Sequence, residues 1–135
     1  MDFFVFISEQ YLLVSALLVF VYAFIWNEKR RGGKTLSIHE VTRLVNKDEA
    51  LLVDLREPAD FKKGHIVNSI NIPFNKINDR WEELTPSKEK TIILVDKIGQ
   101  HAGSVGNTLR TKEFNVARLS GGLAEWENQN LPLVK

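Results

Sequence analysis

The chain divides into an apolar N-terminal stretch and a longer stretch in which short apolar runs alternate with amphipathic ones. Residues 11–26 (YLLVSALLVFVYAFIW) contain no charge, Gly or Pro, and residues 3–7 add a second apolar run. A membrane-spanning helix needs about 20 apolar residues, and residues 11–26 alone would rise only about 24 Å. The pattern therefore predicts a single transmembrane helix that spans about residues 5–26.

The remainder of the chain has the pattern of an alternating strand and helix protein. Ser37 and Glu40 form a capping box at the start of a helix, and the apolar positions after it share one helical face: Ile38, Val41, Leu44 and Val45. Strands are predicted over residues 51–55, 70–72, 91–95 and 116–119. Helices are predicted over residues 74–84, 102–113 and 123–128. This alternation predicts an α/β fold, with a mostly parallel central sheet flanked by helices on both faces.

Three interpretations of the apolar stretch were weighed. A signal peptide begins with basic residues and ends at a small-residue cleavage site, whereas Asp2 opens this chain and no A-x-A site follows. A helix packed on the globular domain would turn a polar face to water, but residues 11–26 are apolar on every face, and the domain that follows is complete without them. A permanent single-pass anchor is the interpretation that the pattern favours.

The flanking charges predict the orientation of this anchor. Bases follow the stretch, namely Lys29, Arg30, Arg31 and Lys34, whereas Asp2 and Glu9 precede it. Positive charge stays in the cytoplasm, so we expect an N-terminus outside and a cytoplasmic C-terminal domain at the inner membrane of a bacterial-type cell. Glu9 either reaches the outer headgroups or pairs with another membrane protein.

These features divide the chain into three segments. Residues 1–27 form the membrane segment, residues 28–35 a basic juxtamembrane linker, and residues 36–135 a globular domain. Gly32 and Gly33 are expected to make the linker a flexible joint.

The amino-acid composition excludes several kinds of partner and site. Lys and Arg number 18 and Asp and Glu 17 in the 135 residues, and this near-neutral balance argues against a nucleic-acid partner. The absence of cysteine excludes disulfides, thiolate zinc sites and thiol redox chemistry. The three histidines lack the spacing of metal ligands, so neither a metal nor a cofactor is expected.

A connected set of motifs runs through the predicted domain. Its parts are Asp54-Leu55-Arg56, Asp60-Phe61, Gly64-His65-Ile66, Asn68-Ser69-Ile70-Asn71-Ile72-Pro73, and Leu119-Ser120-Gly121-Gly122-Leu123 followed by Trp126. In this order and at these spacings, they resemble the rhodanese-like family of sulfurtransferase-homology domains. The resemblance implies that fold for residues 36–135.

The resemblance marks several residues as structural: Asp54, Arg56, Gly64, His65, Gly121, Gly122 and Trp126. The guanidinium of Arg56 is expected to pair with the carboxylate of Asp54 or Glu57. Gly64 is expected to provide a turn with positive φ, and His65 to form a structural hydrogen bond rather than to act as a base.

In this family the nucleophilic cysteine follows the strand that corresponds to residues 91–95. Asp96 stands there in this chain, and the loop that resembles the family's active-site loop consists of Asp96, Lys97, Ile98, Gly99, Gln100, His101 and Ala102. His101 stands where the loop of this family usually has an arginine. The family's loop amides stabilise the anionic sulfur, so we expect them to hold the Asp96 carboxylate instead.

An aspartate cannot carry a persulfide, so sulfurtransferase activity is not expected and no catalytic residue is assigned. The sequence favours a non-catalytic module that binds or scaffolds a protein partner at the membrane. Two alternatives stay open: a sulfur carrier that relies on a thiol from elsewhere, and a sensor of small anions. Asp96 as an acceptor of phosphoryl groups is disfavoured, because no second acid follows it in a D-x-D pattern.

Overall fold

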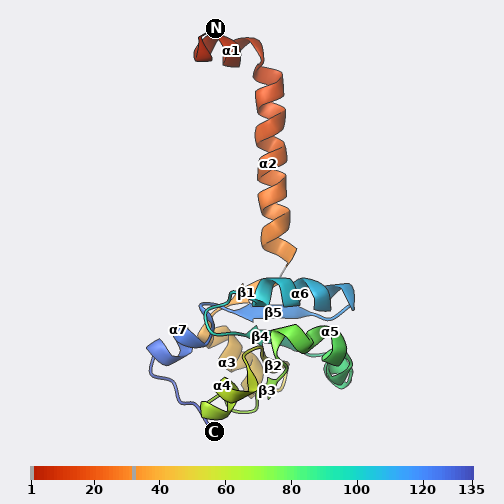
Figure 1. Ribbon diagram of the computed structural model, residues 1–135, viewed down its shortest axis with the longest axis vertical. Coiled ribbons are helices and arrows are strands. Elements are labelled where there is room, and N and C mark those ends of the chain that lie inside the picture. Colours follow the sequence, from red (N-terminus) through yellow and green to blue (C-terminus); the bar gives the residue numbers. More distant parts are fainter. Residues whose placement is uncertain (1, 32) are drawn as a thin grey trace. The chain divides into compact units, whose positions relative to one another are not determined.

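A computed structural model describes residues 2–31 and 33–135, and these residues form two compact units, Met1–Arg30 and Arg31–Lys135 (Figure 1). Met1, at the start of the predicted membrane segment, and Gly32, half of the predicted joint, lie outside the described residues.

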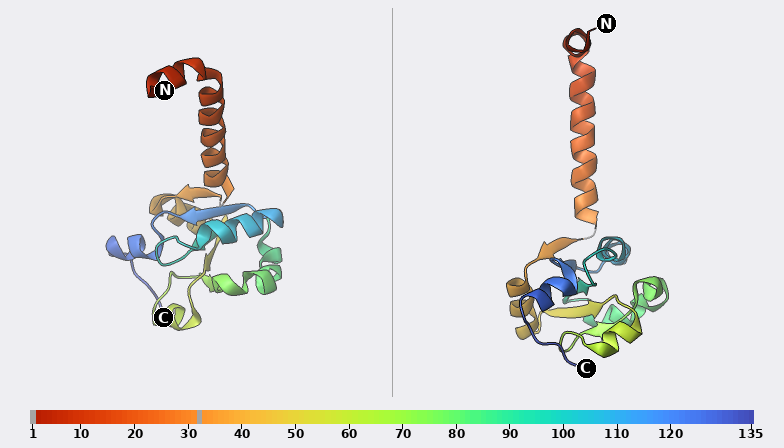
Figure 2. Two further views of the ribbon diagram at one scale, coloured as in Figure 1. Left: turned by 45° about the horizontal axis from the view of Figure 1, so that its top comes forward. Right: turned by 60° about the vertical axis from the view of Figure 1, so that its left-hand side comes forward.

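The N-terminal unit consists of two helices, α1 (Phe3–Glu9) and α2 (Tyr11–Arg31), and Figure 2 shows the sharp bend between them. The helix axes differ by 86°. The prediction of one continuous spanning helix is therefore wrong. Within the described residues, no single helix is long and apolar enough to cross a membrane. Helix α1 and residues Tyr11–Asn27 together have the length and apolar composition of a membrane span that is bent in the middle.

The bend has a local cause in the polar residues that separate the two apolar runs. The Ser8 hydroxyl donates to the Val5 carbonyl, and Gln10 leaves the helical conformation with φ −112° and ψ 28°. Asp2 caps the start of α1, where its carboxylate accepts from the Phe4 amide at 3.4 Å. The polar interruption therefore ends one helix and allows the next to start in another direction.

The C-terminal unit is built on a parallel sheet of five strands in the order β1-β5-β4-β2-β3. The strands are β1 (Lys34–Leu36), β2 (Ala50–Asp54), β3 (Ile70–Asn71), β4 (Thr91–Val95) and β5 (Val116–Leu119). Every neighbouring pair runs parallel, so the predicted α/β class is confirmed. Strand β1 was not expected, because its three residues fall partly within the segment 28–35 interpreted as a linker.

Helices cover both faces of the sheet (Figures 1 and 2). They are α3 (Ile38–Asn46), α4 (Pro58–Lys63), α5 (Ile77–Arg80), α6 (Ala102–Thr111) and α7 (Gly122–Asn128), with 3₁₀ helices η1 (Phe74–Lys76) and η2 (Trp81–Ser87). The Ser37 hydroxyl accepts from the Glu40 amide at 3.3 Å, as the capping box predicts. The single helix expected over 74–84 is instead three short pieces, and α4 was not expected.

Strand β4 separates two apolar cores. Ile93 and Val95 face a core shared with α3 and α7, whereas Ile92 and Leu94 face a core shared with α5 and α6. All four side chains are buried, as expected for a strand covered on both faces. This packing fixes the carboxyl end of β4, from which the candidate site begins.

Candidate functional site

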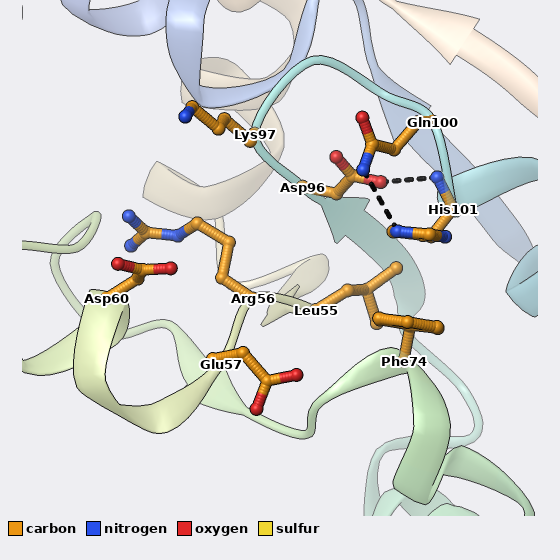
Figure 3. Close-up of a pocket in the computed structure, with 9 residues that line it drawn as sticks. All are labelled: Leu55, Arg56, Glu57, Asp60, Phe74, Asp96, Lys97, Gln100 and His101. Carbon is orange, nitrogen blue, oxygen red and sulfur yellow. Dashed lines mark hydrogen bonds between the residues drawn. The ribbon is translucent and has the colours of Figure 1, made fainter.

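The loop between β4 and α6 is folded around the side chain of Asp96, its first residue. Asp96 is buried, with 3% of its surface exposed. One carboxylate oxygen, Oδ1, accepts from the amides of Ile98 and Gly99 at 3.1 and 3.0 Å. The other, Oδ2, accepts from the His101 amide, the bond drawn as a dashed line in Figure 3. The carboxylate is therefore the anion that these three amides stabilise, and the geometry agrees with the hypothesis drawn from the sequence.

The start of α7 holds the same loop from its backbone side. The Leu123 amide donates to the Asp96 carbonyl at 2.7 Å, and the Ala124 amide donates to the Lys97 carbonyl at 2.9 Å. Gly122 makes this approach possible: its φ is +63°, and a Cβ there would lie 2.5 Å from the Asp96 carbonyl oxygen. The loop is thus fixed by its own carboxylate and by a helix that packs against it.

A hollow of about 170 Å³ opens beside the Asp96 side chain, between the ends of β2 and β4. Figure 3 shows the residues that line it, namely Leu55, Arg56, Glu57, Asp60, Phe74, Asp96, Lys97, Gln100 and His101. Its position agrees with the rule that parallel sheets bind ligands at the carboxyl ends of their strands. The lining holds three carboxylates and two permanently charged bases, so it carries no excess of positive charge.

Arg56 is committed to Asp54 rather than to Glu57. Its Nε donates to Oδ1 of Asp54 at 3.0 Å and its Nη2 donates to Oδ2 at 2.8 Å, while Nη2 also donates to the Gly64 carbonyl at 2.8 Å. The Asp54 side chain is 1% exposed. This buried, two-point pair ties the end of β2 to the segment after α4, so its role is structural.

His65 also has a structural environment. Its ring stacks on Phe61 at 3.8 Å, its Nδ1 lies 2.9 Å from the Phe61 carbonyl oxygen, and its backbone forms a bridge with Val134. The expectation for Gly64 is wrong, because its φ of 162° is extended backbone that any residue adopts. A Cβ there would lie 3.4 Å from the Leu133 side chain, which is close to an ordinary van der Waals contact.

The remaining residues that the sequence singled out occupy fixed positions around the loop. His101 stacks on Phe74 with ring centroids 3.7 Å apart, and its Nε2 lies 3.0 Å from Nε2 of Gln100. Gly121 has a φ of +72°. Trp126 is buried and donates from Nε1 to the Pro132 carbonyl at 3.1 Å.

Sequence reasoning missed four residues of the hollow: Leu55, Glu57, Asp60 and Phe74. Leu55 and Glu57 follow the end of β2, and Phe74 follows the end of β3. The rule that strand ends meet at one edge of a parallel sheet would have indicated them. It was applied only to the loop after β4.

The chemistry of this arrangement differs from that of a thiol site. No sulfur nucleophile exists in the chain, and both oxygens of Asp96 already accept hydrogen bonds. Across residues 2–31 and 33–135, no three side chains of His, Asp or Glu gather closely enough to hold a metal ion. The site as built is a rigid loop beside a shallow hollow.

The comparisons with known proteins define the class. The rhodanese-like domain family matches residues 37–129, and the chain belongs to this family. It is 39% identical over 122 residues to the uncharacterized protein YibN of Escherichia coli K12, which covers 89% of this chain and 85% of YibN. It is 34% identical over 134 residues to the uncharacterized protein BU052 of Buchnera aphidicola, covering 96% and 93% of the two chains.

More distant matches agree with the family. A sulfurtransferase of Allochromatium vinosum is 28% identical over 93 residues, which are 68% of this chain and 85% of that protein. The crystal structure of a rhodanese-related protein from Thermoplasma volcanium superposes with a TM-score of 0.68 at 23% identity, and covers 75% of this chain and 97% of that one. This second likeness shows the shared fold. That Asp96 stands where the family places its cysteine stays a prediction.

Proposed function

We propose that this chain is a non-catalytic rhodanese-homology module, anchored in the inner membrane, that binds a protein partner on its cytoplasmic side. The observation that carries the proposal is the buried Asp96 carboxylate with its three loop amides. A sulfurtransferase must form a persulfide on a thiolate at this point. A carboxylate cannot form one, and its hydrogen bonds fill the site that would stabilise it.

The outer surface of the loop is the part of the site that remains available to a partner. Lys97, Ile98 and Gln100 are exposed, and the Ile98 side chain is 60% exposed. The loop beneath them is held by Asp96 and by the first amides of α7. A surface that is already ordered loses little conformational entropy on binding, which favours recognition by this loop.

The apolar N-terminal unit supports the membrane part of the proposal. Most apolar side chains of α1 and α2 are exposed, and the pair has the length and composition of a broken span. Glu9 lies at the break, where a headgroup region would solvate its charge. The bases at 29, 30, 31 and 34 then favour a cytoplasmic C-terminal domain.

Partner binding is tested by co-purification of the full chain from membranes in a mild detergent. Ile98→Arg should remove the partner that the unaltered chain retains, because a large charge then replaces the exposed apolar tip of the loop. Val67→Arg is the matched control, since Val67 is also exposed, at 52%, but lies outside the loop. Equal retention by both variants would contradict the assignment of this loop as the binding surface.

The absence of sulfur transfer is tested separately. The purified full chain should not turn over thiosulfate with cyanide or with dithiols. Asp96→Cys should place a thiol among the same three amides and lower its pKa below the ordinary value near 8.5. Asn107→Cys, at an exposed position of α6, should keep an ordinary thiol pKa. Turnover by the unaltered chain would overturn the proposal.

The geometry gives less support to the two alternatives. A small-anion sensor would use the loop amides, but three of them already bond to Asp96. A carrier that borrows an external thiol would need the same amides to stabilise the sulfur.

A further inference from the structure

A second hollow borders the loop and shares no lining residue with the first. It measures about 190 Å³ and is lined by Thr35, Ile98, Gly99, Ala102, Arg118, Leu119, Ser120 and Gly121. These residues come from β1, the loop, the start of α6, β5 and the turn that precedes α7. The hollow therefore lies where five neighbouring segments of the domain meet.

Arg118 is the unusual member of this lining. Its Nε is buried and has no hydrogen-bond partner, and its Nη2 donates to the Gly33 carbonyl at 3.3 Å. Among the residues that the structure describes, no carboxylate forms an ion pair with it. A buried donor without an acceptor is costly, and more so on a charged group. Arg118 thus has hydrogen-bonding capacity that the domain does not use.

The other polar groups of this hollow can donate as well. Thr35 and Ser120 are among its lining residues, and their hydroxyl groups make no hydrogen bond within the described parts of the chain. Ala102 is the first residue of α6, so the hollow also lies near the positive end of that helix dipole. No acidic residue is among the lining.

Such a set of donors selects a ligand with several acceptor oxygens and negative charge. The planar guanidinium fork matches phosphate oxygens in a two-point arrangement, and hydroxyl groups complete such sites as neutral donors. On the other side of the loop, Asp96 occupies the amides. Arg118 is therefore the base beside this loop whose buried Nε donor the domain leaves unused.

We propose that this second hollow binds a phosphate group, with Arg118 as its principal ligand and Thr35 and Ser120 as supporting donors. The phosphate belongs either to a free phosphate ion or to the headgroup of an anionic lipid. Thr35 lies four positions after Arg31, the last residue of α2, so the intervening chain spans at most about 14 Å. A headgroup phosphate is thus a source within reach if α2 is anchored in a membrane.

The experiment observes the Nε–H resonance of Arg118 in the full chain, labelled with ¹⁵N-arginine and held in micelles of a phosphate-free maltoside detergent. Inorganic phosphate is titrated at constant ionic strength, with chloride as the reference salt. In a second arm, short-chain phosphatidic acid is added to the same micelles. The Arg118 resonance is assigned by its absence from the spectrum of Arg118→Gln. The resonance of Arg43, which is exposed on α3, serves as the internal control.

A saturable shift of the Arg118 resonance in either arm supports the site. A response to inorganic phosphate identifies a free ion as a sufficient ligand, and a response to phosphatidic acid alone identifies the lipid headgroup. Arg118→Lys should bind roughly tenfold more weakly, because it keeps the charge but loses the fork. An unmoved Arg118 resonance in both arms, or a shift equal to that of Arg43, overturns the proposal. The readout on the unaltered chain stays decisive if a variant fails to fold.

Discussion

At the scale of the residue, the Asp96 carboxylate is the acceptor around which the loop after β4 is folded. Because this carboxylate is covalently part of the chain, it occupies the three loop amides whether or not a ligand is present. The hydrogen bonds of Asp96 therefore stabilise the fold without any ligand.

Asp96→Ala should leave the amides of Ile98, Gly99 and His101 without an acceptor. We expect the free energy of unfolding of the full chain to fall by about 2 to 4 kcal/mol, in keeping with the loss of buried, charge-assisted hydrogen bonds. Asp96→Asn should cost less because it keeps one acceptor oxygen. Urea unfolding in detergent, followed by tryptophan fluorescence, measures the effect.

The control for this series is Asp79→Ala, which removes an exposed carboxylate on α5. It should change the free energy of unfolding by less than about 0.5 kcal/mol. If Asp96→Ala is no more destabilising than Asp79→Ala, the three amides do not depend on the carboxylate.

Gly122→Ala should also disturb the loop, because a Cβ would lie 2.5 Å from the Asp96 carbonyl oxygen and 3.0 Å from the amides of Ile98 and Gly99. Either the loop or α7 must then move. We expect a loss of about 2 kcal/mol or more in unfolding free energy, through overpacking and a strained φ. The amide resonances of Ile98 and Gly99 should shift.

Gly103→Ala gives the matched comparison within α6. The nearest atom to its added Cβ is Nη1 of Arg118 at 3.6 Å, an ordinary contact. Replacing a helical glycine with alanine should stabilise the chain by about 0.5 to 1 kcal/mol. A destabilisation equal to that of Gly122→Ala would show that close approach is not the reason for Gly122.

The sequence supported some residue roles and not others. The sequence limited the partner of Arg56 to Asp54 or Glu57, and the structure shows Asp54. The place of Asp96 at the start of the loop was inferred from the family resemblance. The expectation for Gly64 was wrong, because its backbone is extended there and needs no positive φ of the left-handed region. Nothing local marks Arg118, since its isolation depends on which segments surround it in the fold.

At the scale of the element, short segments were the ones that sequence reasoning missed or misjudged. Strand β4 was predicted with its observed bounds because a threonine followed by four consecutive apolar residues leaves few alternatives. Strand β1 has three residues and α4 has six, too few for a periodic pattern to emerge. The apolar stretch was predicted as one helix because hydropathy averages over the polar residues at 8–10 that bend it.

The membrane role of α2 can be tested by Leu17→Arg. Leu17 lies within the apolar part of the helix and is 62% exposed. An arginine at the centre of a spanning helix costs about 2.5 to 3.5 kcal/mol on insertion scales. The fraction of the chain that stays with membranes after alkaline extraction should therefore fall clearly, whereas Val67→Arg in the domain should leave it unchanged. Equal extraction of both variants would contradict anchoring by α2.

A second element-scale prediction concerns the junction of α5 and η2. Arg80 donates to Glu83 from Nε at 2.7 Å and from Nη2 at 3.1 Å, and these hydrogen bonds lower the pKa of the Glu83 carboxyl. A carboxyl whose pKa is lowered by folding adds stability above its unfolded pKa, and this contribution is lost as the pH falls through the folded value. The effect on stability is small because the pair is exposed.

Arg80→Gln should therefore raise the pKa of Glu83 back to its ordinary range. A ¹³C titration of the glutamate carboxyl groups measures the change directly. Lys88→Gln, which removes a charge at the C-terminal end of η2 and leaves this hydrogen bond intact, should leave the Glu83 pKa where it was. A Glu83 pKa that is the same with and without Arg80 would refute the pairing in solution.

At the scale of the whole molecule, the alternation of strands and helices was enough to predict the α/β class, because each parallel pair needs a crossover. The order of the strands was not predicted, since it depends on contacts between segments far apart in the sequence. The same limit applies to the two hollows. Each combines residues from several segments, and their separation by one loop emerges only when the sheet is assembled.

The position of β1 has a consequence for how this domain can be separated from its N-terminal unit. Strand β1 pairs with β5 at the edge of the sheet, yet the family match starts only at residue 37. A chain cut at residue 37 would leave one side of β5 with unpaired amides and carbonyls, a template for pairing with other molecules. We expect it to self-associate in size-exclusion chromatography, whereas a chain cut at residue 33 should stay monomeric. The first three residues of the sheet would then protect it against aggregation.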